Sequence, residues 1–196
     1  MKKKILLLNP NKWGRGITAI WIASHSSILK KSGFDVKLFD ATFYENWSDF
    51  EIKINTENKQ FKKTDYLKKI KFNKSDICSD FKKTVKKYNP DIIFWSALSS
   101  HIHGEGEYIN IEYGHELVSE VKDYKGLKIC GGIQATANSE KTQRRFKGID
   151  FLISGESELV LNNITKYYPD LNKIKKLNGV NYYDKIKKKF IKNPRQ

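Results

Sequence analysis

The stretch Asp91-Ile92-Ile93-Phe94-Trp95-Ser96-Ala97-Leu98-Ser99-Ser100 decides the fold of this chain. It follows Asn89-Pro90 and runs into a polar, glycine-containing loop, His101-Ile102-His103-Gly104. The apolar run is too short for a helix and too apolar for an exposed strand, so it predicts a strand buried on both faces of a parallel sheet. Because ligands of open α/β sheets bind beyond the carboxyl ends of the strands, we expect residues 96–103 to lie at a binding site.

Length and composition favour one folded unit. The 196 residues suffice for a substantial core, and a hydrophobic content of 39% argues against global disorder. No apolar run approaches the roughly 20 residues that cross a bilayer. The apolar residues 5–8 end at once in Asn9-Pro10-Asn11, which favours a first buried strand over a signal peptide. We therefore expect a cytoplasmic protein.

The formal net charge of +15 raises nucleic-acid binding as an alternative. The lysines concentrate at 53–87 and 173–192, where they are scattered among isoleucine, asparagine and tyrosine. Little arginine accompanies them, and no RNP, zinc-finger or helix-turn-helix signature is present. We expect most of this charge to be solvated surface, and nucleic acid remains the less favoured partner.

Cysteine and histidine do not form a recognisable metal motif. Cys78 and Cys130 are isolated, so they predict neither a disulfide framework nor a CxxC site. The three clustered cysteines that hold a [4Fe–4S] cluster are absent from the sequence. His101 and His103 share a loop but have no third ligand at a recognisable spacing. No metal-ligating residue is predicted.

The remaining titratable residues have ordinary structural explanations. His25 and His115 fall on expected helices, where we predict packing or surface roles. The acidic pairs Glu105/Glu107 and Glu156/Glu158 stand where helices begin, and a negative charge there complements the helix dipole.

Strands and helices alternate along the chain. This alternation predicts an α/β, flavodoxin-like (Rossmann-like), doubly wound sheet of five parallel strands. Residues 1–170 would form this domain, with a lysine-rich insertion at about 45–75, and 171–196 a C-terminal β-hairpin and linker. The expected strands are 4–9, 34–40, 91–100, 127–130 and 149–153, the expected helices 18–32, 75–88, 105–124, 139–146 and 159–167, and the hairpin joins 179–183 to 189–191.

Small and polar residues follow four of these strands. They occupy Asn9 to Gly16, Asp40 to Tyr44, Ser96 to His103, and Gly131-Gly132 with Thr136. Glycines allow close backbone approach, and hydroxyls donate hydrogen bonds to amides or phosphate oxygens. This chemistry suits the holding of a large, polar-edged cofactor better than the cleavage of a bond.

One of these loops leaves a second ligand class open. Trp13-Gly14-Arg15-Gly16 lacks the GK[ST] ending of a P-loop and the third glycine of a GxGxxG fingerprint. A nucleotide- or flavin-binding module therefore stays an alternative.

Short motifs spread over nearly the whole chain support a family resemblance. They are Asn9-Pro10, Lys31-Ser32-Gly33, Val36, Asp40, Asn89-Pro90-Asp91, Ser96, Cys130-Gly131-Gly132 with Ala135-Thr136, Gly148-Ile149-Asp150-Phe151, Ser154-Gly155-Glu156-Ser157-Glu158 and Leu177-Asn178-Gly179-Val180. In this order they resemble the cobalamin (vitamin B12)-binding domain at the N-terminus of cobalamin-dependent radical S-adenosylmethionine (SAM) enzymes.

The resemblance implies a function for this chain and a second domain that acts with it. The chain would hold the corrinoid cofactor for a methyltransferase or cyclase, and alone it would catalyse nothing. SAM and the [4Fe–4S] cluster would belong to a radical SAM barrel domain, in cis or in trans, that is not part of this chain.

The wider cobalamin-binding family carries a DxHxxG…SxL…GG pattern, which this chain matches in part. Ser96-Ala97-Leu98 matches SxL and Gly131-Gly132 matches GG, and both are expected to flank the benzimidazole tail. Asp40 matches the aspartate, but Thr42 stands at the histidine position and Glu45 at the glycine position.

The departure at Thr42 implies cobalamin held without an imidazole as the lower cobalt ligand. Thr42 or Tyr44 is then a candidate to face the cobalt. No catalytic residue is predicted. The cofactor-binding candidates are Asn9, Gly14, Gly16, Asp40, Thr42, Tyr44, Ser96, Leu98, Ser99, Gly131, Gly132, Thr136, Gly155 and Glu156.

Overall fold

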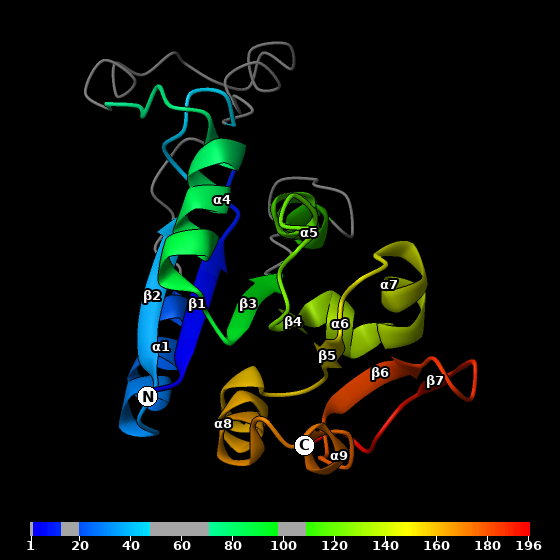
Figure 1. Ribbon diagram of the computed structural model, residues 1–196. Helices are drawn as coiled ribbons and strands as arrows, with labels where there is room; N and C mark the ends of the chain where they lie inside the picture. Colours follow the sequence, from blue (N-terminus) through cyan, green and yellow to red (C-terminus); the bar gives the residue numbers. More distant parts are fainter. Residues whose placement is uncertain (1, 13–19, 48–70, 98–108) are drawn as a thin grey trace.

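A computed structural model describes residues 2–12, 20–47, 71–97 and 109–196 (Figure 1). Within these ranges the chain is an α/β protein whose seven strands form one sheet in the order β2-β1-β3-β4-β5-β6-β7. The strands are β1 (Lys4–Asn9), β2 (Asp35–Asp40), β3 (Ile92–Ala97), β4 (Leu127–Gly132), β5 (Phe151–Ile153), β6 (Val180–Asp184) and β7 (Lys189–Ile191). The helices are α1 (Ile20–Lys31), α4 (Ile77–Tyr88), α5 (Ile109–Ser119), α6 (Ile133–Ala137), α7 (Ser139–Arg145), α8 (Ser157–Tyr167) and α9 (Leu171–Ile174).

The sheet is mostly parallel. β2, β1, β3, β4 and β5 pair in parallel, in the order of a flavodoxin-like fold, and the strand order reverses between β1 and β3. The expected five-stranded sheet with a separate hairpin differs from this arrangement. β6 pairs antiparallel with β5 through Leu152 and Asn181, and β7 pairs antiparallel with β6, so the two strands extend the sheet to seven.

Two apolar layers cover the sheet, because successive side chains of a strand point to opposite faces. Leu6, Leu8, Ile93 and Trp95 pack toward the side of α4 and α5. The intervening residues of β1 and β3 pack toward the side of α1, α8 and α9. Figure 1 shows α4 and α1 on opposite faces of β1 and β2. Burial of β1 and β3 on both faces explains their continuous apolar runs.

Local residues set two helix ends. Gly33 (φ 85°) follows α1 in the left-handed region, where its N–H bonds Lys30 and the next N–H bonds Leu29, as in a Schellman motif. Asp76 caps α4 by accepting from the N–H of Ser79 at 2.7 Å.

Other element boundaries differ from the sequence pattern. The short helices α6 and α9 were not expected, because five and four residues are too few to show a 3.6-residue period. Of the expected helix at 105–124, residues 105–108 lie outside the described ranges, and α5 ends at Ser119. No helix in the described ranges is long and apolar enough to span a membrane. The insertion expected at about 45–75 falls largely outside these ranges.

The contact between α5 and β3 depends on a missing side chain. A Cβ on Gly114 would lie 2.3 Å from Cδ1 of the fully buried Trp95, so α5 approaches the sheet only because this residue is glycine.

We expect Gly114→Ala to lower the free energy of unfolding by about 1–3 kcal/mol, the usual effect of overpacking a core. Urea denaturation followed by tryptophan fluorescence measures the change. Lys86→Ala, at an exposed position of α4, is the control and should stay within about 0.5 kcal/mol of the parent. An unchanged midpoint for Gly114→Ala would contradict this packing.

Candidate functional site

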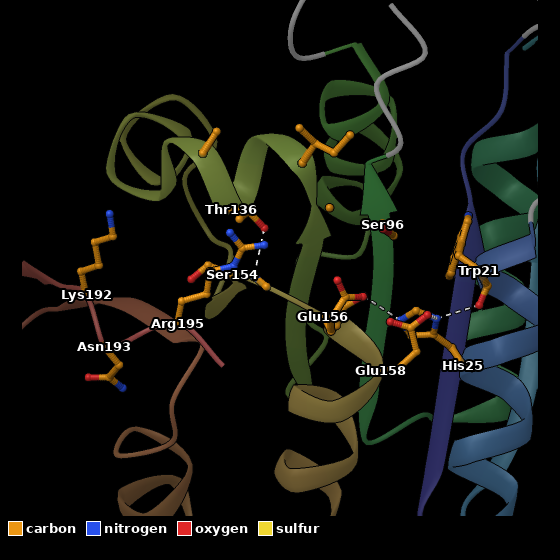
Figure 2. A pocket seen from close by; sticks show the side chains of 15 residues that line it. Trp21, His25, Ser96, Thr136, Ser154, Glu156, Glu158, Lys192, Asn193 and Arg195 are labelled. Atoms are coloured by element: carbon orange, nitrogen blue, oxygen red, sulfur yellow. Dashed lines mark hydrogen bonds and ion pairs between the residues drawn. The ribbon is translucent and has the colours of Figure 1, made fainter.

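A cavity of about 620 Å³ lies at the carboxyl ends of β3, β4 and β5, on the side of α1 and α8. This volume falls in the range of about 300–1,000 Å³ that is typical of small-molecule sites. Figure 2 shows the lining side chains. They belong to Trp21, His25, Ser96, Gly132, Ile133, Thr136, Ala137, Ser154, Gly155, Glu156, Ser157, Glu158, Lys192, Asn193 and Arg195.

The parallel register of β3 and β4 makes room for this cavity. Ser96 pairs with Gly131, and Ala97 pairs with Gly132. A Cβ on Gly131 would lie 3.3 Å from both the Phe94 ring and the Cβ of Ser157, so a larger residue there would press on the cavity wall. Two small residues face two glycines where the strands end, which keeps this edge of the sheet open.

Ser96 brings an unused polar group to the cavity. The residue is 8% exposed, and its hydroxyl makes no hydrogen bond within the part of the chain that the structure describes. Because Ser96 lines the cavity, its hydroxyl is available to a ligand or an ordered water at this place.

His25 forms the opposite wall with its ring stacked on Phe94, the two centroids 5.1 Å apart. Its Nδ1 lies 2.7 Å from the carbonyl oxygen of Trp21, which can only accept, so Nδ1 carries a proton. In the neutral ring, Nε2 then accepts from the hydroxyl of Ser157 at 2.8 Å. Burial lowers the pKa of His25, against the backbone hydrogen bond and the Glu158 carboxylate, which raise it. Both nitrogens are therefore engaged and the ring is neutral at pH 7.

Charged groups of both signs surround the cavity. Glu158 accepts from the Ser24 hydroxyl at 3.1 Å and lies 3.7 Å from Nδ1 of His25. Its carboxylate therefore lies at the side of the cavity that α1 forms. Lys192 and Arg195 come from the segment after β7, and Figure 2 shows Arg195 beside Thr136 and Ser154 on the other side.

A second polar group lies at the ends of β1 and β2. The Asn9 amide donates to Asp40 at 3.0 Å, and the Thr42 hydroxyl donates to the same carboxylate at 2.6 Å. The Asn11 amide donates to Thr42 Oγ1 at 3.1 Å. Thr42 is only 2% exposed. These residues bond one another, and they are not among the lining of the cavity.

Tyr44 lies on the α4 side of the sheet. Its ring stacks on Phe39 with centroids 5.9 Å apart, and its hydroxyl lies 3.4 Å from the Asp80 carboxylate. Burial raises the pKa of Tyr44, and the nearby Asp80 carboxylate adds to this effect.

The structure thus divides the candidate residues. Ser96, Gly132, Thr136, Gly155 and Glu156 line one cavity, with Gly131 directly behind it. Asn9, Asp40 and Thr42 form the separate polar group, and Tyr44 packs elsewhere. Gly14, Gly16, Leu98 and Ser99 lie outside the described ranges, as do His101 and His103.

Trp21, His25, Lys192 and Arg195 are among the lining residues that the list of cofactor-binding candidates missed. His25 was expected to have a packing or surface role, and its packing also places it in the cavity wall. The hydrogen bond between His25 and Ser157 joins residues 132 positions apart, so no local sequence pattern could predict it.

The fold and the cavity define an α/β domain of flavodoxin-like topology with a cavity at the carboxyl ends of its strands. No protein-family model matches the chain, and no curated protein matches it in sequence.

Two solved structures are similar over the whole chain. One is the radical SAM methyltransferase TsrM from Kitasatospora setae with cobalamin and a [4Fe–4S] cluster bound, with 14% identity and a TM-score of 0.69. The other is the cobalamin-dependent SAM radical enzyme OxsB with aqua-cobalamin bound, with 16% identity and a TM-score of 0.58. The chain spans 29% and 22% of these proteins, and at such identities the similarity shows a shared fold.

Because His25 is buried and neutral, we expect the free energy of unfolding to fall in acid. The unfolded chain takes up a proton near the ordinary histidine pKa of 6.5, whereas the folded chain resists it until lower pH. The unfolded state therefore binds more protons in this window, and the free energy of unfolding falls as the pH drops below 6.5 until the folded-state pKa is passed.

Urea denaturation at several pH values measures this loss. His25→Gln should reduce the fall relative to the parent, and His115→Gln, which alters a histidine on α5 outside the cavity, should keep it. An equal fall in parent and His25→Gln would show that other groups cause it.

Proposed function

We propose that this chain is a cobalamin-binding domain that serves a radical SAM-type methyltransferase or cyclase. The observation that carries the proposal is the cavity at the ends of β3 and β4, where the free hydroxyl of Ser96 faces the glycine pair Gly131-Gly132. The two similar solved structures, which share the fold, are of proteins with cobalamin bound.

The lining fits the nucleotide tail of the cofactor. Cobalamin is larger than the cavity, so only the tail would enter and the corrin ring would lie over the carboxyl ends of the strands. A tail that passes between sheet and helices needs small residues, which Ser96, Gly131 and Gly132 provide. Ser96 supplies a donor or acceptor for the polar atoms of the tail, and the ring of Trp21 offers apolar surface in the cavity lining.

Two observations support cobalamin held without a histidine lower ligand. Thr42, at the family's histidine position, is buried and committed to Asp40 and Asn11. His25, which lines the cavity, already uses both ring nitrogens.

The bound cofactor supplies the cobalt chemistry of methyl transfer, and the share of this chain is to place it. We propose that SAM and the [4Fe–4S] cluster are held by a radical SAM barrel that acts with this domain. Within the ranges that the structure describes, no three His, Cys, Asp or Glu residues gather as a metal site would require.

Purified protein mixed with hydroxocobalamin should retain the corrinoid absorption after desalting and should unfold at a higher temperature. Ser96→Leu fills the cavity floor and should weaken binding at least about tenfold, as expected when a ligand group is excluded sterically. Ser119→Leu, at an exposed position of α5, is the matched control and should bind like the parent.

The alternatives give different results. No retained corrinoid and no stabilisation by it would refute the proposal, and stabilisation by FMN or ATP instead would favour a flavin or nucleotide module. Because no imidazole would ligate cobalt, the spectrum of the bound corrinoid should show no change at about pH 6.5, where histidines titrate, apart from the titration of its own cobalt-bound water at higher pH.

A further inference from the structure

The segment after β7 returns to the carboxyl ends of the strands and lies along the cavity. Asn193 fixes it: the side-chain amide donates to the carbonyl oxygens of Lys175 and Leu177 at 2.8 and 2.9 Å. The carbonyl oxygen of Pro194 accepts from the N–H of Gly179 at 2.6 Å. This C-terminal segment, residues 192–196, is therefore part of the cavity wall.

The same segment determines which way a buried amide points. The backbone N–H of Asn193 donates to Oδ1 of the fully buried Asn181 at 3.0 Å, so that atom must be the oxygen. Nδ2 of Asn181 then donates to the hydroxyl oxygens of Ser139 and Ser154, at 3.0 and 2.7 Å. Ser154 Oγ therefore accepts, and its own proton is left to donate.

The hydroxyl oxygen of Thr136 also acts as an acceptor. Its Oγ1 accepts from the backbone N–H of Gly155 at 3.1 Å, a bond that cannot reverse. Within the described part of the chain, neither Thr136 nor Ser154 has an acceptor for its hydroxyl proton. Both residues line the cavity, so both hydroxyl protons are available to an acceptor bound there.

Arg195 adds a positive charge to these donors. A Cβ on Gly155 would lie 3.2 Å from Cγ and 3.4 Å from Nε of Arg195, so the glycine lets the arginine side chain lie flat against the loop before α8. Arg195 makes no ion pair within the described ranges, and Figure 2 shows it beside Thr136 and Ser154. Glu156 is the nearest acidic residue of this loop and is exposed, whereas Glu158 is engaged with His25 and Ser24.

We infer that Arg195, Thr136 and Ser154 form a phosphate-ester subsite, and that the C-terminal segment thereby completes the ligand site. Hydroxyl protons and a guanidinium are the donors that phosphate oxygens accept. The inference rests on the proposed function for the identity of the ester, which is then the phosphodiester in the nucleotide loop of cobalamin. Lys192, at the same cavity, adds a more distant positive charge.

The test compares cobalamin with cobinamide, a corrinoid that lacks the nucleotide loop and its phosphate. Arg195→Gln should weaken hydroxocobalamin binding about tenfold, the usual size of one charge-assisted contact, and leave cobinamide binding unchanged. Arg195→Lys should recover part of the loss, because it keeps the charge without the planar fork. Thr136→Val should show the same selective loss.

Arg144→Gln removes an equal charge from α7, away from this cavity, and should alter neither affinity. Equal binding of hydroxocobalamin by parent and Arg195→Gln would overturn the inference, as would an equal loss for both corrinoids.

Failure of the proposed function can be told apart from failure of the subsite. If the parent binds no corrinoid, inorganic phosphate tests the subsite alone: it should raise the unfolding temperature of the parent more than that of Arg195→Gln. Identical responses of the two proteins to phosphate would then overturn the subsite as well.

Discussion

The site depends on the pairing of β3 with β4, which sets Ser96 against Gly131 and Ala97 against Gly132. Parallel strands that carry large residues at their ends would close the space between the sheet and α8. Here the last two positions of β4 have no side chains, and the hydroxyl of Ser96 has no partner within the described residues. The register therefore creates the open space at the strand ends and exposes Ser96 to it, while α6 and the C-terminal segment add the other polar groups of the cavity.

Two polar groups at the same edge of the sheet show why position alone does not identify a site. Asn9, Asp40 and Thr42 lie at the carboxyl ends of β1 and β2, and from sequence they look as suited to a ligand as the cavity residues do. In the fold they bond one another at 2.6 to 3.4 Å. Ser96, Thr136 and Ser154 differ because, among the residues that the structure describes, no acceptor takes their hydroxyl protons. A satisfied cluster joins strands, and an unsatisfied one is free to bind a ligand.

The sequence predicts the parts of the fold that local physics determines. The apolar runs of β1 and β3, the turn glycine Gly33 and the cap at Asp76 each follow from neighbouring residues. The rest depends on contacts between distant segments. The addition of β6 to β5 needs Asn181 to meet Leu152, and the neutral state of His25 needs Ser157. The role of Arg195 appears only when the C-terminal segment returns over Gly155.

The addition of β6 to the sheet has a consequence for any shortened form of this protein. A chain cut at residue 170, the boundary that the sequence pattern suggests, would leave β5 as an unpaired outer strand of three fully apolar residues. Such an edge invites association with other chains. The cut would also remove Asn181, whose amide holds Ser154 and Ser139. A minimal fragment would thus be prone to self-association, and the hydroxyls at its ligand site would no longer be held in place.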